Sequence, residues 1–267
     1  MSDLASSSSP EIRRMALCHL APVPDDLQHN RRTIERALEQ AANLGAHWIV
    51  TPELSSCGYQ FARHLGTDWI TVQPDPWVKT LMQFAAEHQV HLFLGHAEAD
   101  VHTGKLHNAV LAISDQGELL GSARKHNVLP GSEGWSTRSQ QAAVFEVQDI
   151  KVGVLICADA YTSKVSRELL AQGAQMILAP SAWGPGLHGP EGEWESRSLD
   201  TGIPVVVCNR TGAEGNLSFE GSTSGFIRAG KREKVFEPAG PALILLDWTV
   251  QDGQVVVLSG REVPLEV

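Results

Sequence analysis

The sequence is poor in cysteine, and its four thiols are widely scattered. Cys18, Cys57, Cys157 and Cys208 form no CxxC pair and show no metal-ligand spacing. Four isolated thiols in a chain of 267 residues indicate a reduced, cytoplasmic protein rather than a disulfide framework. The eleven histidines include no HExxH motif and no convincing ligand set, so we expect no metal site.

Long apolar runs and basic clusters are also absent. No apolar run approaches the roughly eighteen residues needed to cross a bilayer. The formal net charge is -10, and the basic pairs Arg13-Arg14, Arg31-Arg32 and Lys231-Arg232 stand alone. An acidic chain without a basic patch does not attract nucleic acid or an anionic membrane. We therefore expect neither a nucleic acid nor a membrane as partner.

The N-terminal segment differs in composition from the rest of the chain. It is rich in serine and lacks the basic start and apolar stretch of a signal peptide. We expect residues 1–12 to form a disordered lead. Residues 13–267 show no linker and no repeat, and this length is sufficient for one sizeable core, so we expect a single domain.

Apolar segments alternate with helical patterns along that domain. Strands are predicted at residues 15–20, 48–50, 91–95, 109–113, 152–156, 176–179, 205–208, 225–228 and 243–248. Helices are predicted around residues 34–42, from Asp75-Pro76 onward, and from about Thr162 to Gln172. This alternation predicts an α/β fold whose sheets are covered by helices.

Three polar residues are candidates for chemistry. Cys157 follows a buried strand and precedes a helix, a position that exposes a thiol and directs the backbone N–H of Ala158 toward whatever the thiol attacks. Glu53 also follows a buried strand, and Lys125 lies in a charged stretch. A lone cysteine is more often a buried structural residue, and a lone glutamate or lysine is usually solvated. Position alone therefore leaves both interpretations open.

The stretches around these residues occur in a recognisable order. They are 51–54 (Thr-Pro-Glu-Leu) with Gly58-Tyr59, 104–109 (Gly-Lys-Leu-His-Asn-Ala), 125–129 with Glu133, 152–159 with its Cys-x-Asp, and 209–212 (Asn-Arg-Thr-Gly) with 219–222 (Phe-Glu-Gly-Ser). Together they resemble the motifs of the nitrilase-like carbon–nitrogen hydrolase superfamily. The resemblance implies a four-layer α-β-β-α sandwich as a single domain.

The same resemblance implies roles for the residues. Cys157 would be the nucleophile, Glu53 the base and Lys125 the oxyanion partner together with the N–H of Ala158. Glu133 would orient Lys125 or the substrate. The reaction would be hydrolysis of a small linear amide through a thioester, with no metal or organic cofactor. The resemblance also implies at least a homodimer.

Two departures from the family pattern and several alternatives stay open. His107 stands where tyrosine is usual, and Lys164 stands where a glutamate is usual, which leaves the start of the following helix undetermined. An N-carbamoyl amidohydrolase, a nitrilase and a non-catalytic binding protein are the alternatives to an amidase. Aromatic and histidine side chains in or beside the motif loops are candidates for the substrate pocket, although the tryptophans among them would serve equally at a subunit interface. These candidates are Tyr59, Trp135, Tyr161, Trp183 and His188.

Overall fold

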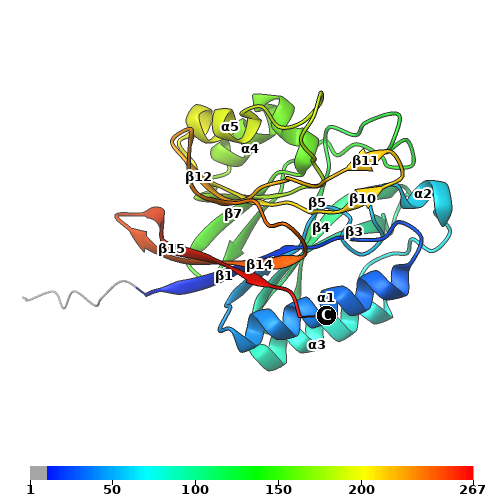
Figure 1. The fold of residues 1–267 in the computed structure, drawn as a ribbon, viewed down its shortest axis with the longest axis horizontal. Coiled ribbons are helices and arrows are strands. Elements are labelled where there is room, and N and C mark those ends of the chain that lie inside the picture. The colour runs from blue at the N-terminus through cyan, green and yellow to red at the C-terminus, as the bar shows by residue number, and fades with distance from the viewer. Residues whose placement is uncertain (1–10, 267) are drawn as a thin grey trace, which may run out of the picture.

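Two mixed β-sheets face each other between two layers of helices. The computed structural model describes residues 11–266. Figure 1 shows α4 and α5 above the sheets and α1 and α3 below them, which is the predicted α-β-β-α sandwich in one domain. The predicted lead falls mainly on residues 1–10, which lie outside the described residues. Glu11, at its end, accepts a hydrogen bond from Thr249 through its carbonyl oxygen.

The first sheet has seven strands. Their order is β15 (Gln254–Pro264), β14 (Ala242–Gln251), β1 (Arg13–His19), β2 (Trp48–Val50), β3 (His91–Ala99), β4 (Leu106–Ile113) and β5 (Leu119–Arg124). Strands β1, β2 and β3 are parallel, whereas the other pairs are antiparallel. The loop that follows β2 contains Glu53, and Lys125 follows β5 directly.

The second sheet has six strands. Their order is β13 (Lys231–Phe236), β12 (Ser224–Arg228), β9 (Val205–Cys208), β8 (Met176–Pro180), β7 (Ile150–Val154) and β6 (Val144–Val147). Strands β7, β8 and β9 are parallel, so their carboxyl ends meet at one edge. A short hairpin, β10 (Ala213–Glu214) with β11 (Leu217–Ser218), follows β9.

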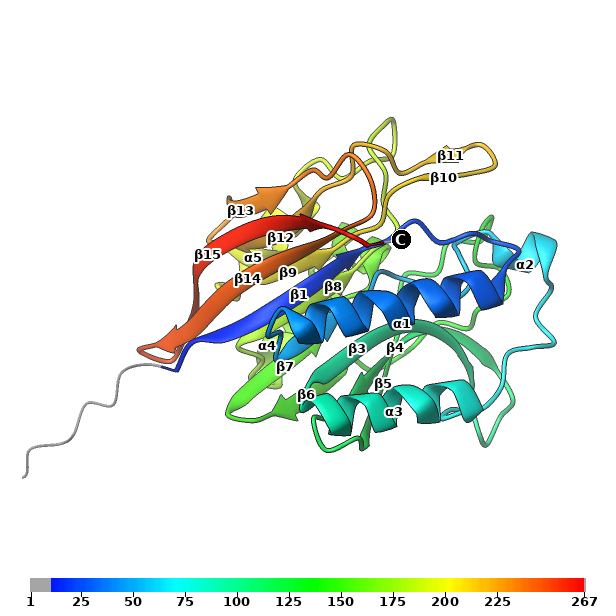
Figure 2. The same cartoon turned by 60° about the horizontal axis from the view of Figure 1, so that its bottom comes forward.

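Most of the helices cover the outer faces of the sheets, whereas α2 lies in the loop region after β2. The helices are α1 (Leu27–Asn43), α2 (Phe61–His64), α3 (Pro76–His88), α4 (Ser163–Ala171) and α5 (Glu193–Thr201), with a short 3-10 helix at Cys157–Tyr161. Asp75 begins α3 as predicted, because its carboxylate accepts a hydrogen bond from the N–H of Val78 at 2.7 Å and Pro76 follows it. Figure 2 shows α1 and α3 lying side by side over the seven-stranded sheet.

Alternation along the strands divides the apolar residues between two layers. On β1, Met15 and Leu17 belong to the cluster between the two sheets, whereas Ala16 and Cys18 belong to the cluster beneath α1 and α3. A strand that is apolar on both faces reads as a continuous apolar run, which is how the sequence shows it. All four cysteines are buried and free.

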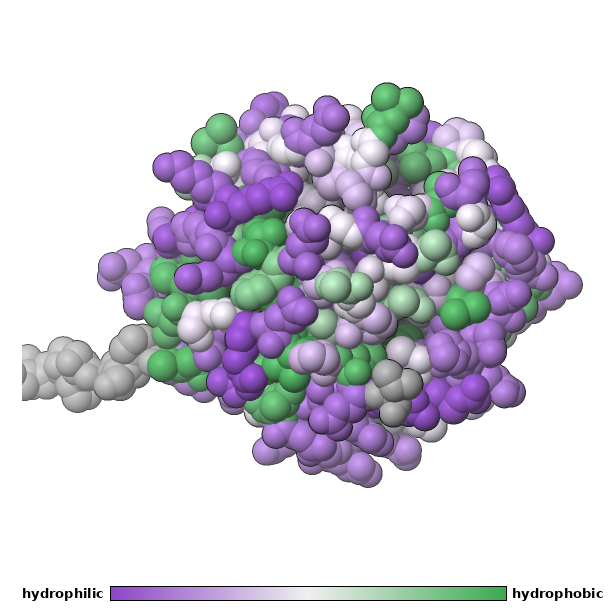
Figure 3. Space-filling view, in the orientation of Figure 1, coloured by the Kyte–Doolittle hydropathy of each residue, from purple (hydrophilic) through white to green (hydrophobic). Residues whose placement is uncertain are grey.

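The surface is mostly polar. Figure 3 shows hydrophilic side chains over most of one face, with apolar side chains gathered around the β14–β15 hairpin. Within residues 11–266, none of the helices combines the length and the apolar character that a membrane crossing requires.

Candidate active site

Glu53 lies in the loop that follows β2 and is fully buried. The main chain just before Glu53 crosses close to Gly95 of β3. A Cβ on Gly95 would lie only 1.9 Å from the carbonyl oxygen of Pro52, so this crossing leaves no room for a side chain. Glu53 Oε1 accepts hydrogen bonds from Lys125 Nζ at 2.6 Å and from Asn108 Nδ2 at 2.7 Å. Glu53 Oε2 accepts one from the N–H of Ala182 at 3.0 Å. The carboxylate is thus held from three sides.

Lys125 follows β5 directly and has no exposed surface. Its ammonium group lies 2.8 and 2.9 Å from the two carboxylate oxygens of Glu133, in addition to its contact with Glu53. Glu133 is also fully buried and is fixed by the N–H of Leu129 at 3.0 Å. One buried ammonium between two buried carboxylates is a costly arrangement that needs good hydrogen-bond geometry.

Asn108, on β4, joins the two glutamates. Its side-chain N–H groups reach Glu53 Oε1 at 2.7 Å and Glu133 Oε1 at 2.6 Å. The carbonyl oxygen of Asn108 also accepts a hydrogen bond from the N–H of Lys125 at 2.9 Å. Asn108 had no predicted role, although it lies in the stretch 104–109 that resembles the family motif.

Cys157 opens the 3-10 helix after β7 with a φ of +45°, a left-handed conformation that non-glycine residues rarely adopt. The thiol is buried and lies 3.9 Å from the carbonyl oxygen of Ala182. The main chain of Ala182 therefore contacts both Cys157 and Glu53. The N–H of Ala158 falls at the second position of the 3-10 helix, where an N–H has no intrahelical acceptor.

Asp159 connects the cysteine turn to the lysine segment. Its carboxylate accepts hydrogen bonds from the N–H groups of Ile156 at 3.1 Å, His126 at 3.0 Å and Asn127 at 2.6 Å. The side chain of Asn127 returns a bond to the carbonyl oxygen of Ala158 at 3.0 Å. The cysteine turn and the segment after Lys125 are therefore fixed relative to each other.

Burial dominates the electrostatics of the site. Burial raises the pKa of the Cys157 thiol well above its ordinary value, Glu53 raises it further, and Lys125 opposes both. Burial also raises the pKa of Glu53, again opposed by Lys125. Burial lowers the pKa of Lys125, but the two glutamates more than compensate, so that its pKa lies well above the ordinary value. The free site thus contains a neutral thiol, a charged lysine and a carboxylate with increased basicity.

Three of the five predicted pocket residues line one pocket. A hollow of about 400 Å³ is bounded by Tyr59, Trp183 and His188, together with the loop at residues 184–189 and Phe219. Ala182 is part of its wall, and the Tyr59 ring lies 5.9 Å from Lys125 Nζ, so the pocket adjoins the buried charges. Among the described residues that line it, none has a carboxylate, ammonium or guanidinium side chain.

The other two predicted pocket residues do not line this hollow. Trp135 packs edge-on against Phe61, with the ring centroids 4.8 Å apart. Tyr161 is 45% exposed and packs against Trp183 at 4.9 Å, at the outer side of the pocket. Lys164, where the family pattern has a glutamate, is exposed in the first turn of α4, which begins one residue before it.

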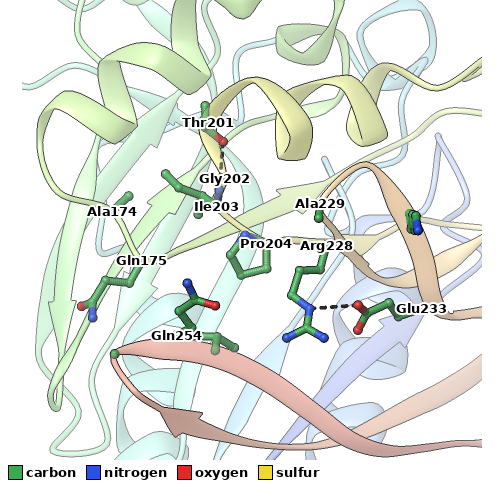
Figure 4. A pocket seen from close by; sticks show the side chains of 13 residues that line it. Ala174, Gln175, Thr201, Gly202, Ile203, Pro204, Arg228, Ala229, Glu233 and Gln254 are labelled. Atoms are coloured by element: carbon green, nitrogen blue, oxygen red, sulfur yellow. Dashed lines mark hydrogen bonds and ion pairs between the residues drawn. The ribbon is translucent and has the colours of Figure 1, made fainter.

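A larger hollow of about 610 Å³ lies elsewhere (Figure 4). It is lined by Gln175 and Pro204, which precede β8 and β9, and by Arg228, which is paired with Glu233 at 2.9 Å. Cys157, Ala182 and Asn209 follow the carboxyl ends of the same parallel strands. In open α/β sheets the carboxyl ends are the usual ligand side, so the smaller hollow is the candidate substrate pocket. The described residues include no cluster of three or more histidine, cysteine or acidic side chains suited to a metal ion.

Comparison with known proteins identifies the family of the chain. The carbon-nitrogen hydrolase family model matches residues 14–229. A probable nitrilase from Schizosaccharomyces pombe is 24% identical, with 87% of this chain and 84% of that protein covered. A citrullinase from Francisella tularensis is 29% identical, with 72% of each chain covered.

Solved structures agree with the sequence comparisons. An amidase from Nesterenkonia sp. has a TM-score of 0.76 at 25% identity, and the match covers 89% of this chain and 90% of that one. One structure of that amidase contains the acetamide moiety of fluoroacetamide added covalently at its active-site cysteine. The fold and the family match together define a carbon–nitrogen hydrolase with an α-β-β-α sandwich. The chain belongs to the carbon–nitrogen hydrolase family, and both the predicted fold and the predicted enzyme class are confirmed.

Proposed function

We propose that this enzyme hydrolyses a small, uncharged linear amide through a thioester on Cys157. The observation that carries the proposal is the buried Lys125 held between Glu53 and Glu133, next to a buried cysteine in a left-handed turn. A purely structural core gains little from such an arrangement, because apolar residues of similar volume would be at least as stable. Two carboxylates, an ammonium group and a thiol are, however, a complete set for acyl transfer.

In the proposed first step, Glu53 accepts the proton of the Cys157 thiol as the sulfur attacks the amide carbon. The raised pKa of the thiol means that little thiolate exists before substrate binds. Glu53 has a raised pKa and is the stronger base for it. The C–N bond then breaks as Glu53 passes the proton to the leaving nitrogen, which departs as ammonia or an amine and leaves the thioester.

In the second step, Glu53 takes a proton from water and the resulting hydroxide attacks the thioester carbon. The C–S bond breaks, the acid is released and the proton returns to the sulfur. Both steps place negative charge on the carbonyl oxygen. Lys125 and the N–H of Ala158 are the donors proposed for that oxygen, and removal of one such donor costs about 3–4 kcal/mol in other hydrolases.

Glu133 and Asn108 are proposed to position the other groups. Both oxygens of Glu133 contact Lys125, which fixes the direction of the ammonium group. Asn108 donates to both glutamates and so sets their separation. Neither residue needs to exchange a proton with the substrate.

The pocket favours an amide over a charged carbamoyl compound. The names of the relatives cover a nitrilase, a citrullinase and an amidase, and do not decide among them. An N-carbamoyl amino acid would bring a carboxylate, which needs a cationic or multiply hydrogen-bonding partner when it is buried. The described pocket residues supply no such cation. A neutral amide has no such requirement.

The test is turnover of a panel of small amides, N-carbamoyl compounds and nitriles, combined with intact-protein mass spectrometry. We expect an amide to be the best substrate and the wild-type protein to carry its acyl group, localised to Cys157 after digestion. Selective turnover of a carboxylated carbamoyl compound would contradict the substrate class. Turnover by Cys157→Ala at the wild-type rate would contradict the mechanism.

We further propose that the enzyme forms a homodimer through its outer helices. Leu199 on α5 is 68% exposed and Leu170 on α4 is 44% exposed, so this layer presents apolar side chains to solvent. Analytical ultracentrifugation should give the mass of two chains, and Leu199→Glu should shift the equilibrium toward one. A wild-type protein that sediments as a single chain at micromolar concentration would refute this arrangement.

A further inference from the structure

A second fully buried ion pair lies behind the pocket wall and takes no part in the chemistry described above. Arg210 follows β9, and Glu214 lies at the end of β10; their side chains form a salt bridge. Both side chains are buried as completely as those of Lys125 and Glu53. A buried ion pair generally contributes little net stability, so its presence needs another reason.

Glu214 holds the loop that presents Tyr59. Its carboxylate oxygens accept hydrogen bonds from the N–H of Tyr59 at 3.0 Å and the N–H of Gln60 at 2.8 Å. The approach leaves no space for a side chain at Gly58, where a Cβ would lie 3.0 Å from Glu214 Oε1 and 2.7 Å from Pro24 Cα. Gly58 also has a φ of +78°, which favours glycine. The glutamate thus sets the position of the Tyr59 backbone.

Arg210 holds Phe219, a second residue of the pocket wall. Its guanidinium lies 4.2 Å from the centroid of the Phe219 ring, a cation–π distance. It also donates to the carbonyl oxygens of Pro22 at 2.9 Å and Thr211 at 3.3 Å. These contacts fix the planar group, and the Phe219 ring rests on it.

The two anchored residues adjoin each other in the pocket wall. Tyr59 and Phe219 both line the hollow of about 400 Å³, and their rings pack edge to face, with the centroids 6.4 Å apart and the planes inclined at 77°. Tyr59 also approaches Lys125, so its position is linked to the reacting centre. One ion pair therefore holds two adjoining wall residues that come from distant parts of the chain.

We propose that Arg210 and Glu214 are a positioning pair that holds Tyr59 and Phe219 as one aromatic wall, against which an uncharged, apolar substituent of the substrate packs. The proposal rests on the function proposed above. It predicts that loss of the pair displaces the aromatic wall, so that bulky apolar substrates lose more than small ones, whose binding depends mainly on the buried triad.

The first readout is steady-state kinetics of Glu214→Gln on an acetamide-to-phenylacetamide series. Glutamine keeps the size and one acceptor oxygen but loses the charge that pairs with Arg210. A displacement of catalytic or binding groups by about 1 Å can cost roughly a hundredfold. We expect kcat/KM for phenylacetamide to fall about ten- to a hundredfold, mainly through KM, and that for acetamide to fall less than about threefold.

The second readout does not depend on hydrolysis. Iodoacetamide and N-phenyliodoacetamide alkylate a cysteine whether or not the protein is an amidase, and peptide mass spectrometry measures the rate at Cys157. We expect the rate ratio, bulky over small reagent, to fall at least about fivefold in Glu214→Gln. If the wild type hydrolyses no amide but this ratio falls, the proposed function is wrong and the positioning of the aromatic wall by the ion pair is retained.

Matched variants separate positioning from folding. Glu98→Gln removes the partner of Arg124 in another largely buried ion pair, at 2.5 Å and away from the pocket. Glu98→Gln should leave unchanged both the ratio of kcat/KM between the two substrates and the ratio of alkylation rates between the two reagents. Arg210→Lys keeps the charge but not the planar surface beneath Phe219, and Phe219→Leu removes that wall directly, so both should lower the ratios in the same direction.

Thermal unfolding of every variant completes the design. If Glu214→Gln fails to fold, the charge-conserving Arg210→Lys and the direct Phe219→Leu provide the same comparison. Folded variants with lower thermal stability but wild-type ratios for both substrates and both reagents would overturn the proposal, because the pair would then only stabilise the fold.

Discussion

Replacement of Lys125 by methionine tests whether the two buried glutamates depend on one ammonium group. Methionine has a similar length and no charge, so the packing is largely conserved. In the native protein Lys125 Nζ contacts Glu53 at 2.6 Å and Glu133 at 2.8 Å. In the variant, Asn108 is the only side chain described here that still donates to both. Removal of one member of a buried ionic cluster typically costs about 3–5 kcal/mol.

The cost should depend on pH with a definite sign. Burial and Glu133 already raise the pKa of Glu53, and Lys125 opposes them, so its loss raises that pKa further. An acid whose pKa is higher in the folded than in the unfolded state destabilises the fold increasingly as pH rises between the two values. The stability deficit of Lys125→Met relative to wild type should therefore be larger at pH 8 than at pH 5.

Urea denaturation at pH 5 and pH 8 measures the difference in the free energy of unfolding between the variant and the wild type. In thermal unfolding, a cost of about 3–5 kcal/mol corresponds to a decrease in Tm at pH 8 of about 6–20 °C, because domains of this size lose about 2–4 °C per kcal/mol. Arg228→Met is the control, because the side chains of Arg228 and its partner Glu233 are both about a third exposed. Its cost should stay within about 1 kcal/mol. A deficit for Lys125→Met that is below about 1 kcal/mol, or equal at pH 5 and pH 8, would refute the reasoning.

Three further predictions follow from the same contacts. Cys157→Ala should abolish turnover with an unchanged circular dichroism spectrum, and residual wild-type activity would exclude Cys157 as nucleophile. In rapid-quench mass spectrometry, Glu53→Gln should block formation of the acyl-enzyme, whereas Glu133→Gln should slow it less; the reverse order would exchange their roles. Burial lowers the pKa of His96 to about 4. The unfolded state therefore binds a proton at His96 more readily than the folded state, and the folded state loses stability as pH falls from about 6.5 toward 4. His96→Gln should flatten the pH dependence of the urea midpoint in this range, and an unchanged slope would contradict this.

The central strands could be predicted from sequence because they are apolar on both faces. Residues 48–50 and 205–208 are strands as expected, and burial between a sheet and a helix layer explains the continuous apolar runs. Strand β13 was not predicted. Its sequence, Lys-Arg-Glu-Lys-Val-Phe, is mostly charged because it forms the edge of its sheet, and an edge strand needs no apolar pattern.

The site was less accessible to local reasoning. By composition, Lys125 is expected to be exposed, yet it is fully buried by contact with Glu53, 72 residues earlier. The resemblance of the motifs identified the residues that the fold brings together. The role of Asn108 could not be inferred, because it depends on the register that aligns β4 with β5 and places one amide between two carboxylates. The pocket candidates Trp135 and Tyr161 show the limit: nearness to a motif does not determine which way a side chain points.

Asp159 gives a prediction that separates activity from folding. Burial raises its pKa to about 6, although the N–H of Asn127, Lys125 and the N–H groups of Ile156 and His126 act against burial. Since this pKa is raised above the ordinary value, protonation of Asp159 favours the folded state as pH falls through about 6. A protonated carboxyl group, however, can no longer accept all three N–H groups with full strength, because hydrogen bonds to a charged acceptor are the stronger ones.

The kinetic consequence of protonating Asp159 follows from the two segments that its carboxylate connects. The three N–H groups belong to the turn of Cys157 and to the segment after Lys125. We expect kcat to fall as pH decreases below about 6, measured where circular dichroism shows the protein still folded. Asp159→Asn should have a low kcat at every pH and lack this acidic limb, because the amide is neutral throughout. If Asp159→Asn retains the same descent below pH 6, the limb belongs to another group, with Glu53 the foremost candidate, and the connecting role assigned to Asp159 is wrong.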